Sequence, residues 1–94
     1  MIRASTANVT NVSDSATVQT ILAANGNRLG FVIANDSTSV LYLKCGAAAT
    51  TTDWTWMLLA DETIDHVDDF IYTGPVTGIW SANASGYAHV TEFE

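Results

Sequence analysis

The chain has 94 residues, of which 48% are hydrophobic and only 14% charged, and its formal net charge is −7. One domain is the natural count at this length, and the apolar fraction is too high for a disordered polar chain. A stability of about 5–14 kcal/mol is typical of a chain this size, and a large catalytic pocket would remove a big share of so small a core. The composition therefore indicates a folded protein and disfavours a multi-step catalyst, and we do not expect an enzyme.

The residue types favour β structure. Thr, Ser and Asn make up 26 residues, whereas Lys, Arg and Glu, which usually cover helix surfaces, total six. Residues 1–16 are polar and weakly patterned, and we expect an N-terminal arm or a loose first strand there. The expected strands of the main domain, residues 17–94, are 17–22, 29–35, 40–45, 55–59, 63–67, 70–73, 76–81 and 87–93. Their spacing predicts a single-domain antiparallel β-sandwich or a jelly-roll-like barrel of seven or eight short strands.

Residues 40–45 give the clearest alternation. Leu41, Leu43 and Cys45 fall on one face of this strand, and Tyr42 falls on the other. We expect the first set to point into the core, with Cys45 as a buried small hydrophobe, because it has no second cysteine to pair with.

Two connections are predicted to be hairpins. Asn35 and Ser37 belong to residue types that form turns, and we expect them to fix the hairpin that leads into the 40–45 strand. The strands 76–81 and 87–93 are expected to form a second hairpin around the polar segment between them.

The charge is uneven along the chain. Residues 1–52 sum to +1, whereas residues 53–94 contain eight acids and neither Lys nor Arg. Because phosphate contacts need a basic surface, we expect no direct nucleic-acid binding, and the same argument disfavours an anionic membrane. The chain has no apolar run long enough to span a bilayer and no signal-peptide pattern at Met1, so we expect no membrane partner.

The densest group of acids lies in residues 61–69. Asp61, Asp65 and Asp68 are weak candidates for calcium ligands, because carboxylate oxygens suit hard cations. Their spacing does not match an EF-hand loop, and solvated charges that protect a sheet edge are the alternative. No cofactor or metal is predicted overall.

His66 and His89 are the only histidines. A hydrolase would pair one of them with a serine and an acid, but the chain lacks a Gly-x-Ser-x-Gly nucleophile elbow. A zinc site would need about four nitrogen or sulfur ligands, and two histidines with Cys45 make a weak set. Catalysis by either histidine is therefore not expected.

The three tryptophans allow a carbohydrate-stacking platform as an alternative function. Trp56 and Trp80 sit among aliphatic residues and are expected to pack in the core. Trp54 follows a polar loop and is the better candidate for an exposed contact, alone or with a tyrosine.

Several stretches of the chain occur in a recognisable order. They are residues 27–37 (NRLGFVIANDS), 41–43 (LYL), Gly46, 72–82 (YTGPVTGIWSA) and 86–92 (GYAHVTE). In this order they resemble a family of small structural proteins encoded by tailed bacteriophages and prophages. The resemblance extends over roughly residues 17–94 and marks a scaffold. Its signature positions in this chain are Arg28, Asn35, Tyr42 and Trp80.

The resemblance implies a component of the virion. We expect a capsid decoration (cement) protein that binds the major capsid protein, or another virion protein, on the outside of the head. A tail, neck or baseplate module is the alternative. The apolar fraction also predicts a homo-oligomer, a trimer or a dimer. The expected interface residues are Ile2, Arg3, Val9, Val12 and Trp54.

Physical roles accompany this resemblance. Arg28 precedes a core strand and is expected to pair with a carboxylate across the sheet. Trp80, which is bulky among small residues, is expected to fill the interior of the sandwich.

Overall fold

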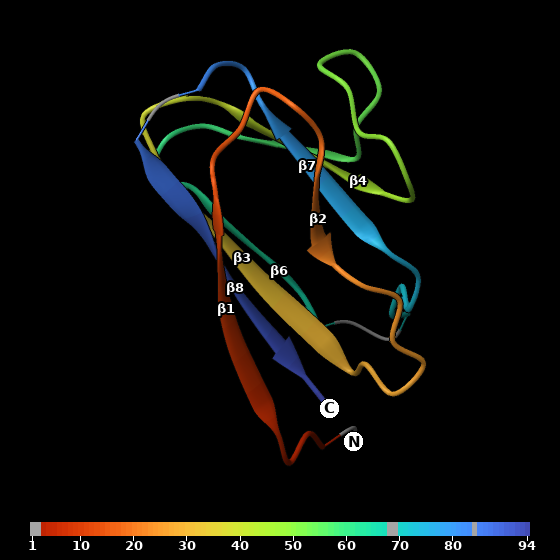
Figure 1. Ribbon diagram of the computed structural model, residues 1–94. Coiled ribbons are helices and arrows are strands. Elements are labelled where there is room, and N and C mark those ends of the chain that lie inside the picture. The colour runs from red at the N-terminus through yellow and green to blue at the C-terminus, as the bar shows by residue number, and fades with distance from the viewer. Residues whose placement is uncertain (1–2, 68–69, 84) are drawn as a thin grey trace.

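The computed structural model describes residues 3–67, 70–83 and 85–94 (Figure 1). These residues form eight strands and no helix, which confirms the all-β prediction. The strands are β1 (Ala7–Ser13), β2 (Gln19–Leu22), β3 (Gly30–Ser37), β4 (Leu41–Cys45), β5 (Trp56–Leu58), β6 (Thr63–His66), β7 (Val76–Trp80) and β8 (Gly86–Phe93).

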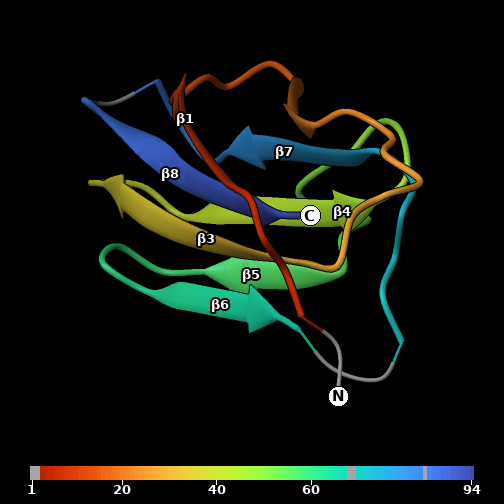
Figure 2. The same cartoon turned by 90° about the horizontal axis from the view of Figure 1, so that it is seen from below.

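Two four-stranded sheets make up the fold. Sheet A has the order β1-β8-β3-β6 and sheet B the order β2-β7-β4-β5, and every strand pair is antiparallel. Figure 2 shows the strands from below, with β8 beside β3 and β7 beside β4. Every connection except β4–β5 carries the chain from one sheet to the other, and this order is that of a jelly-roll sandwich.

The crossing connections overturn both predicted hairpins. The strands β7 and β8 belong to different sheets, and β8 pairs instead with β1 and β3. Asn35 and Ser37 lie within β3, which is in sheet A, while β4 is in sheet B. Short sequence separation favoured local pairing, but in this fold the chain alternates between the two layers at both positions, so neither pair of consecutive strands shares a sheet.

The core lies between the sheets. The inward positions of β4, Leu41 and Leu43, are fully buried as predicted, and Trp80 fills the interior at 1% exposure. Cys45 is only half-buried, because it ends β4 at the rim of the sandwich. The buried apolar cluster comprises Ile21, Leu22, Phe31, Ile33, Leu41, Leu43, Leu58, Val76, Trp80, Ala88 and Val90.

The predicted strand at 70–73 is wrong. In its place, side chains bond the backbone of Tyr72: the Tyr72 N–H donates to His66 Nε2 at 3.2 Å, and the Tyr72 carbonyl accepts from Arg28 at 2.8 Å. Within residues 1–16, where an arm or a loose first strand was predicted, residues 7–13 form a regular strand, since all seven residues of β1 pair with β8.

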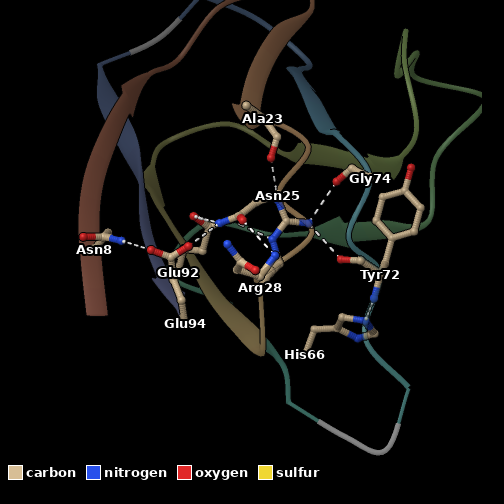
Figure 3. A network of polar contacts seen from close by, with 10 residues as sticks. Asn8, Ala23, Asn25, Arg28, His66, Tyr72, Gly74, Glu92 and Glu94 are labelled. Carbon is tan, nitrogen blue, oxygen red and sulfur yellow. Dashed lines mark hydrogen bonds and ion pairs between the residues drawn. The ribbon is translucent and has the colours of Figure 1, made fainter. Parts of the chain in front are cut away.

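Arg28 is the centre of the polar network in Figure 3. Its side chain is fully buried and its Nε donates to Glu92 at 2.8 Å, so the predicted pairing with a carboxylate is confirmed. The two other guanidinium nitrogens donate to the carbonyls of Ala23, Tyr72 and Gly74 at 2.6–2.9 Å. One side chain thus joins the β2–β3 connection, the segment before β7 and the end of β8.

Asn35 makes a second buried polar centre, on the opposite side of the core. Its amide nitrogen donates to the carbonyls of Ser39, Leu58 and Leu59, and its oxygen accepts from the Trp80 indole at 3.3 Å. This amide links the two sheets, because β3 belongs to sheet A and both Trp80 and Leu58 belong to sheet B. Asn35 thus bonds across the layers, and together with Ser37, whose hydroxyl donates to Asn35 Oδ1 at 2.8 Å, it also braces the turn into β4 through Ser39.

Candidate interaction surface

The outer faces of the two sheets differ in charge. The strands of sheet A contain three carboxylates, Asp36, Asp65 and Glu92, whereas the strands of sheet B contain no Asp or Glu. Glu92 turns inward to Arg28, so Asp36 and Asp65 remain on the outside of sheet A. The body of this acidic protein therefore has one outer face without carboxylates on its strands.

That face of sheet B is also apolar. Its central row crosses three strands, because Tyr42 pairs with Met57 on one side and with Ile79 on the other. Continuing the strand registers by one residue places Val18 beside Ile79, and Leu59 beside Val40. We call this surface the apolar face; it consists of Val18, Val40, Tyr42, Trp54, Met57, Leu59 and Ile79.

Four residues of the apolar face are clearly exposed to solvent. Val18, Trp54, Met57 and Leu59 each have 41–50% of their surface exposed. Large contiguous apolar areas on a folded surface mark sites of contact with other molecules. Since both sheets already bury their inner faces, these side chains are not needed to close the core.

Trp54 extends the apolar face toward the loop before β5. Its ring lies 5.9 Å from the ring of Tyr42, with an angle of 46° between the ring planes. Lys44, on the same side of β4 as Tyr42, pairs with Asp53 at 2.6 Å. The charge at this margin is therefore compensated, and the face is close to neutral.

The expected interface residues do not lie on one surface. Trp54 is on the apolar face, whereas Val9 and Val12 are on β1 of sheet A, with Val9 exposed and Val12 packed against the core. Arg3 is exposed, and Ile2 lies outside the described residues.

Sequence reasoning missed Val18, Met57 and Leu59. Alternation did place Tyr42 opposite the core, and the absence of acids from all four strands of sheet B was visible in the sequence. What was not visible was which strands share a sheet.

Two of the three calcium candidates, Asp61 and Asp65, lie on separate elements. Asp61 sits in the β5–β6 turn with a positive φ of 67°, and Asp65 lies in β6 on the outer side of sheet A. Asp68 lies outside the described residues. Within residues 3–67, 70–83 and 85–94, no three His, Cys, Asp or Glu side chains are grouped closely enough to hold a metal ion.

Both histidines have structural partners. His89 contacts Asp36 at 2.8 Å through Nε2 and Asn11 at 2.7 Å through Nδ1. His66 accepts the Tyr72 N–H and packs against aromatic rings on several sides. The groups bonded to the two imidazoles are thus a carboxylate, an amide and a backbone N–H, and no hydroxyl or thiol is among them.

Cys45 is protected at the rim of sheet B. Burial raises the pKa of the Cys45 thiol above the ordinary 9.0, while a hydrogen bond with Thr55 and the positive charge of Arg28 lower it by smaller amounts. A raised pKa keeps the sulfur in its less reactive thiol form at neutral pH.

Comparison with protein-family models, with curated proteins and with solved structures gave no match. The described ranges contain no helix that is long and apolar enough to cross a membrane.

Proposed function

We propose that this protein is a non-enzymatic structural component of a tailed-phage virion, a capsid decoration (cement) protein that docks on the outer head shell through its apolar face. The supporting observation is the asymmetry of the sandwich. Four exposed apolar side chains gather on the sheet whose strands lack acids, while Asp36 and Asp65 occupy the outside of the other sheet. The resemblance of residues 17–94 to small phage structural proteins supports the same role.

The asymmetry fits a one-sided attachment. A neutral apolar face loses little hydration when it meets the major capsid protein, whereas burial of unpaired carboxylates is costly. The acidic outer face of sheet A would then point to solvent and keep a densely covered particle soluble. The protein would be made in the host cytoplasm and would reside on the exterior of the virion.

Binding to shells that lack this protein tests the proposal. Met57→Glu places a carboxylate in the centre of the apolar face, where it removes about 1 kcal/mol of burial and adds a larger desolvation cost. We expect shell binding in a co-sedimentation assay to weaken by at least about tenfold.

Tyr87→Glu is the matched control for this substitution. It introduces the same charge at a side chain of similar exposure, 47% against 44% for Met57, on the outer face of sheet A. Tyr87→Glu should leave shell binding unchanged. Equal effects of both substitutions, or wild-type protein that does not bind shells, would overturn the proposed docking surface.

Gold labelling of virions separates head from tail. Label distributed over the head supports the decoration role. Label restricted to the tail would replace it with the tail, neck or baseplate alternative.

A carbohydrate-binding module is a second candidate, and the pair of neighbouring rings formed by Tyr42 and Trp54 favours it. Aromatic rings of this kind are suited to stacking against a sugar. Titration with glycans, followed by tryptophan fluorescence, should then show a shift that Trp54→Ala abolishes. No shift at millimolar glycan would remove this candidate.

A further inference from the structure

The strand β1 forms an open edge of sheet A. In the sheet order it is the terminal strand, with β8 on one side and no described strand on the other, as Figure 1 shows for the red strand. Thr6 and Glu94 exchange both backbone hydrogen bonds, and Asp14 N–H donates to the Gly86 carbonyl. Antiparallel bonding alternates, so the N–H and C=O groups of Ala7, Val9, Asn11 and Ser13 point outward from the sheet.

The other three edges carry features that prevent pairing with a further strand. The strand β5 has only three residues, and β2 has four with a shift in register between Thr20 and Leu22. The strand β6 has four residues and carries Asp65. Short length, irregular register and charge are the usual means of blocking sheet edges.

The edge of β1 has none of these protections. It has seven residues in unbroken register with β8, and its sequence, ANVTNVS, contains neither a charge nor a proline. Its residues are exposed on both faces of the sheet except for the half-buried Val12. A long, regular, uncharged edge is a template for another strand.

We propose that a second copy of this chain occupies this edge, with the two β1 strands paired antiparallel about a two-fold axis at Thr10. In this register Thr10 faces Thr10 of the second copy, and Val9 faces Asn11. The two four-stranded sheets become one eight-stranded sheet. This inference does not rest on the proposed function.

This register pairs the free backbone groups of β1 with hydrogen-bond partners and brings no two charged residues together. Its bonded pairs involve the four residues whose N–H and C=O groups point outward, and Thr10, whose backbone bonds to β8, falls at a non-bonded position. Threonine opposite threonine is a favourable cross-strand pair. Two chains that each carry −7 would repel, but no charged residue of either β1 strand lies opposite another.

The mass in solution and a proline substitution test this pairing. We expect wild-type protein to sediment at twice its 10.0 kDa chain mass in a concentration-dependent manner. Val9→Pro removes an outward N–H without removing a bond to β8, so it should leave the monomer folded. Loss of one hydrogen bond from each copy should weaken association by about thirtyfold. Val9→Thr keeps the N–H and should remain dimeric.

Disulfide trapping gives a second readout that does not depend on the proline variant. Non-bonded antiparallel positions have Cα atoms about 4.5 Å apart, a distance that a disulfide accepts. In a Cys45→Ser background, Thr10→Cys should form a covalent dimer on oxidation, whereas Val9→Cys, which faces Asn11 of the second copy, should not.

Three results would overturn the inference. They are a wild-type mass of 10.0 kDa at all concentrations, a dimerisation constant unchanged by Val9→Pro, and cross-linking of Val9→Cys as fast as Thr10→Cys. Met57→Glu lies on sheet B and should leave the dimer intact. A dimer lost with Met57→Glu would place the contact on the apolar face instead, whether or not the protein binds shells.

Discussion

The ion pair between Arg28 and Glu92 predicts an unusual mutant cycle. Replacing both partners of a buried ion pair by apolar residues is often neutral or stabilising, because neither charge is left behind. Arg28, however, also donates to three backbone carbonyls, and its side chain has no exposed surface. The carbonyls remain when both charged side chains are removed, so the double replacement should not restore stability.

The structure sets the magnitudes. Arg28→Met leaves three carbonyls without donors at about 1–3 kcal/mol each, a loss of about 3–9 kcal/mol, while the Glu92 carboxylate is 16% exposed and keeps its hydrogen bond from Asn25. Glu92→Met should cost about 3 kcal/mol, the low end for breaking a buried pair, because the carboxylate is 16% exposed and Arg28 keeps its other acceptors. The double variant should match Arg28→Met, in a fold whose total stability is about 5–14 kcal/mol.

Urea unfolding followed by tryptophan fluorescence measures each free energy of unfolding. Asp53→Asn is the control, since it breaks the exposed pair with Lys44 and should cost no more than about 1 kcal/mol. A double variant as stable as the wild type, or Arg28→Met less harmful than Glu92→Met, would refute the claim that the carbonyl bonds dominate.

Two further predictions concern single positions. Gly86→Ala should lose about 1–3 kcal/mol or more in urea unfolding, because Gly86 has a φ of +138° and an added Cβ would lie 2.2 Å from the Asp36 carbonyl oxygen. Gly26→Ala, where a Cβ meets nothing within 4 Å, should change stability by less than about 1 kcal/mol, and equal losses would contradict this contrast. Cys45 should react with a thiol reagent at about pH 8 more slowly in the folded protein than in urea, because its raised pKa reduces the thiolate. Equal rates would show that neither burial nor the pKa protects it.

Local patterns predicted the strands better than their partners. Alternation in 40–45 identified the buried side of β4, and the strand expected at 29–35 corresponds to β3. Pairing was mispredicted, because strand periodicity says which residues share a face and nothing about which strands share a sheet. The segment 70–73 has strand propensity, but Arg28 and His66 bond its backbone from outside, and such bonds have no local signature.

The same limit applies to the candidate surface. Trp54 was identified from its position after a polar loop. Met57 and Val18 lie 39 residues apart in sequence, and they share a face only because β4 and β7 lie between their strands in sheet B. Asn35 was expected in a turn because asparagine is common there, yet its amide is fully buried and bonds both sheets. The sequence shows that residue 35 is an asparagine, but only the fold shows which groups its side chain bonds.

The two proposed contacts reinforce each other geometrically. The two-fold axis of an antiparallel edge pairing is perpendicular to the sheet, so both copies would carry sheet B on the same side of the eight-stranded sheet. Their two apolar faces would then point in the same direction.

Docking of one apolar face contributes about 3–6 kcal/mol of binding free energy, because its four exposed residues are already about half-buried. Association of two bodies costs an estimated 4–15 kcal/mol, which one face scarcely covers. A dimer that docks both faces bears that cost once, and the second face then binds at a high effective concentration.

At concentrations where it is monomeric, the Val9→Pro variant should therefore bind shells more weakly than the wild type even though its apolar face is unchanged. Equal binding of monomer and dimer would show that each face acts alone.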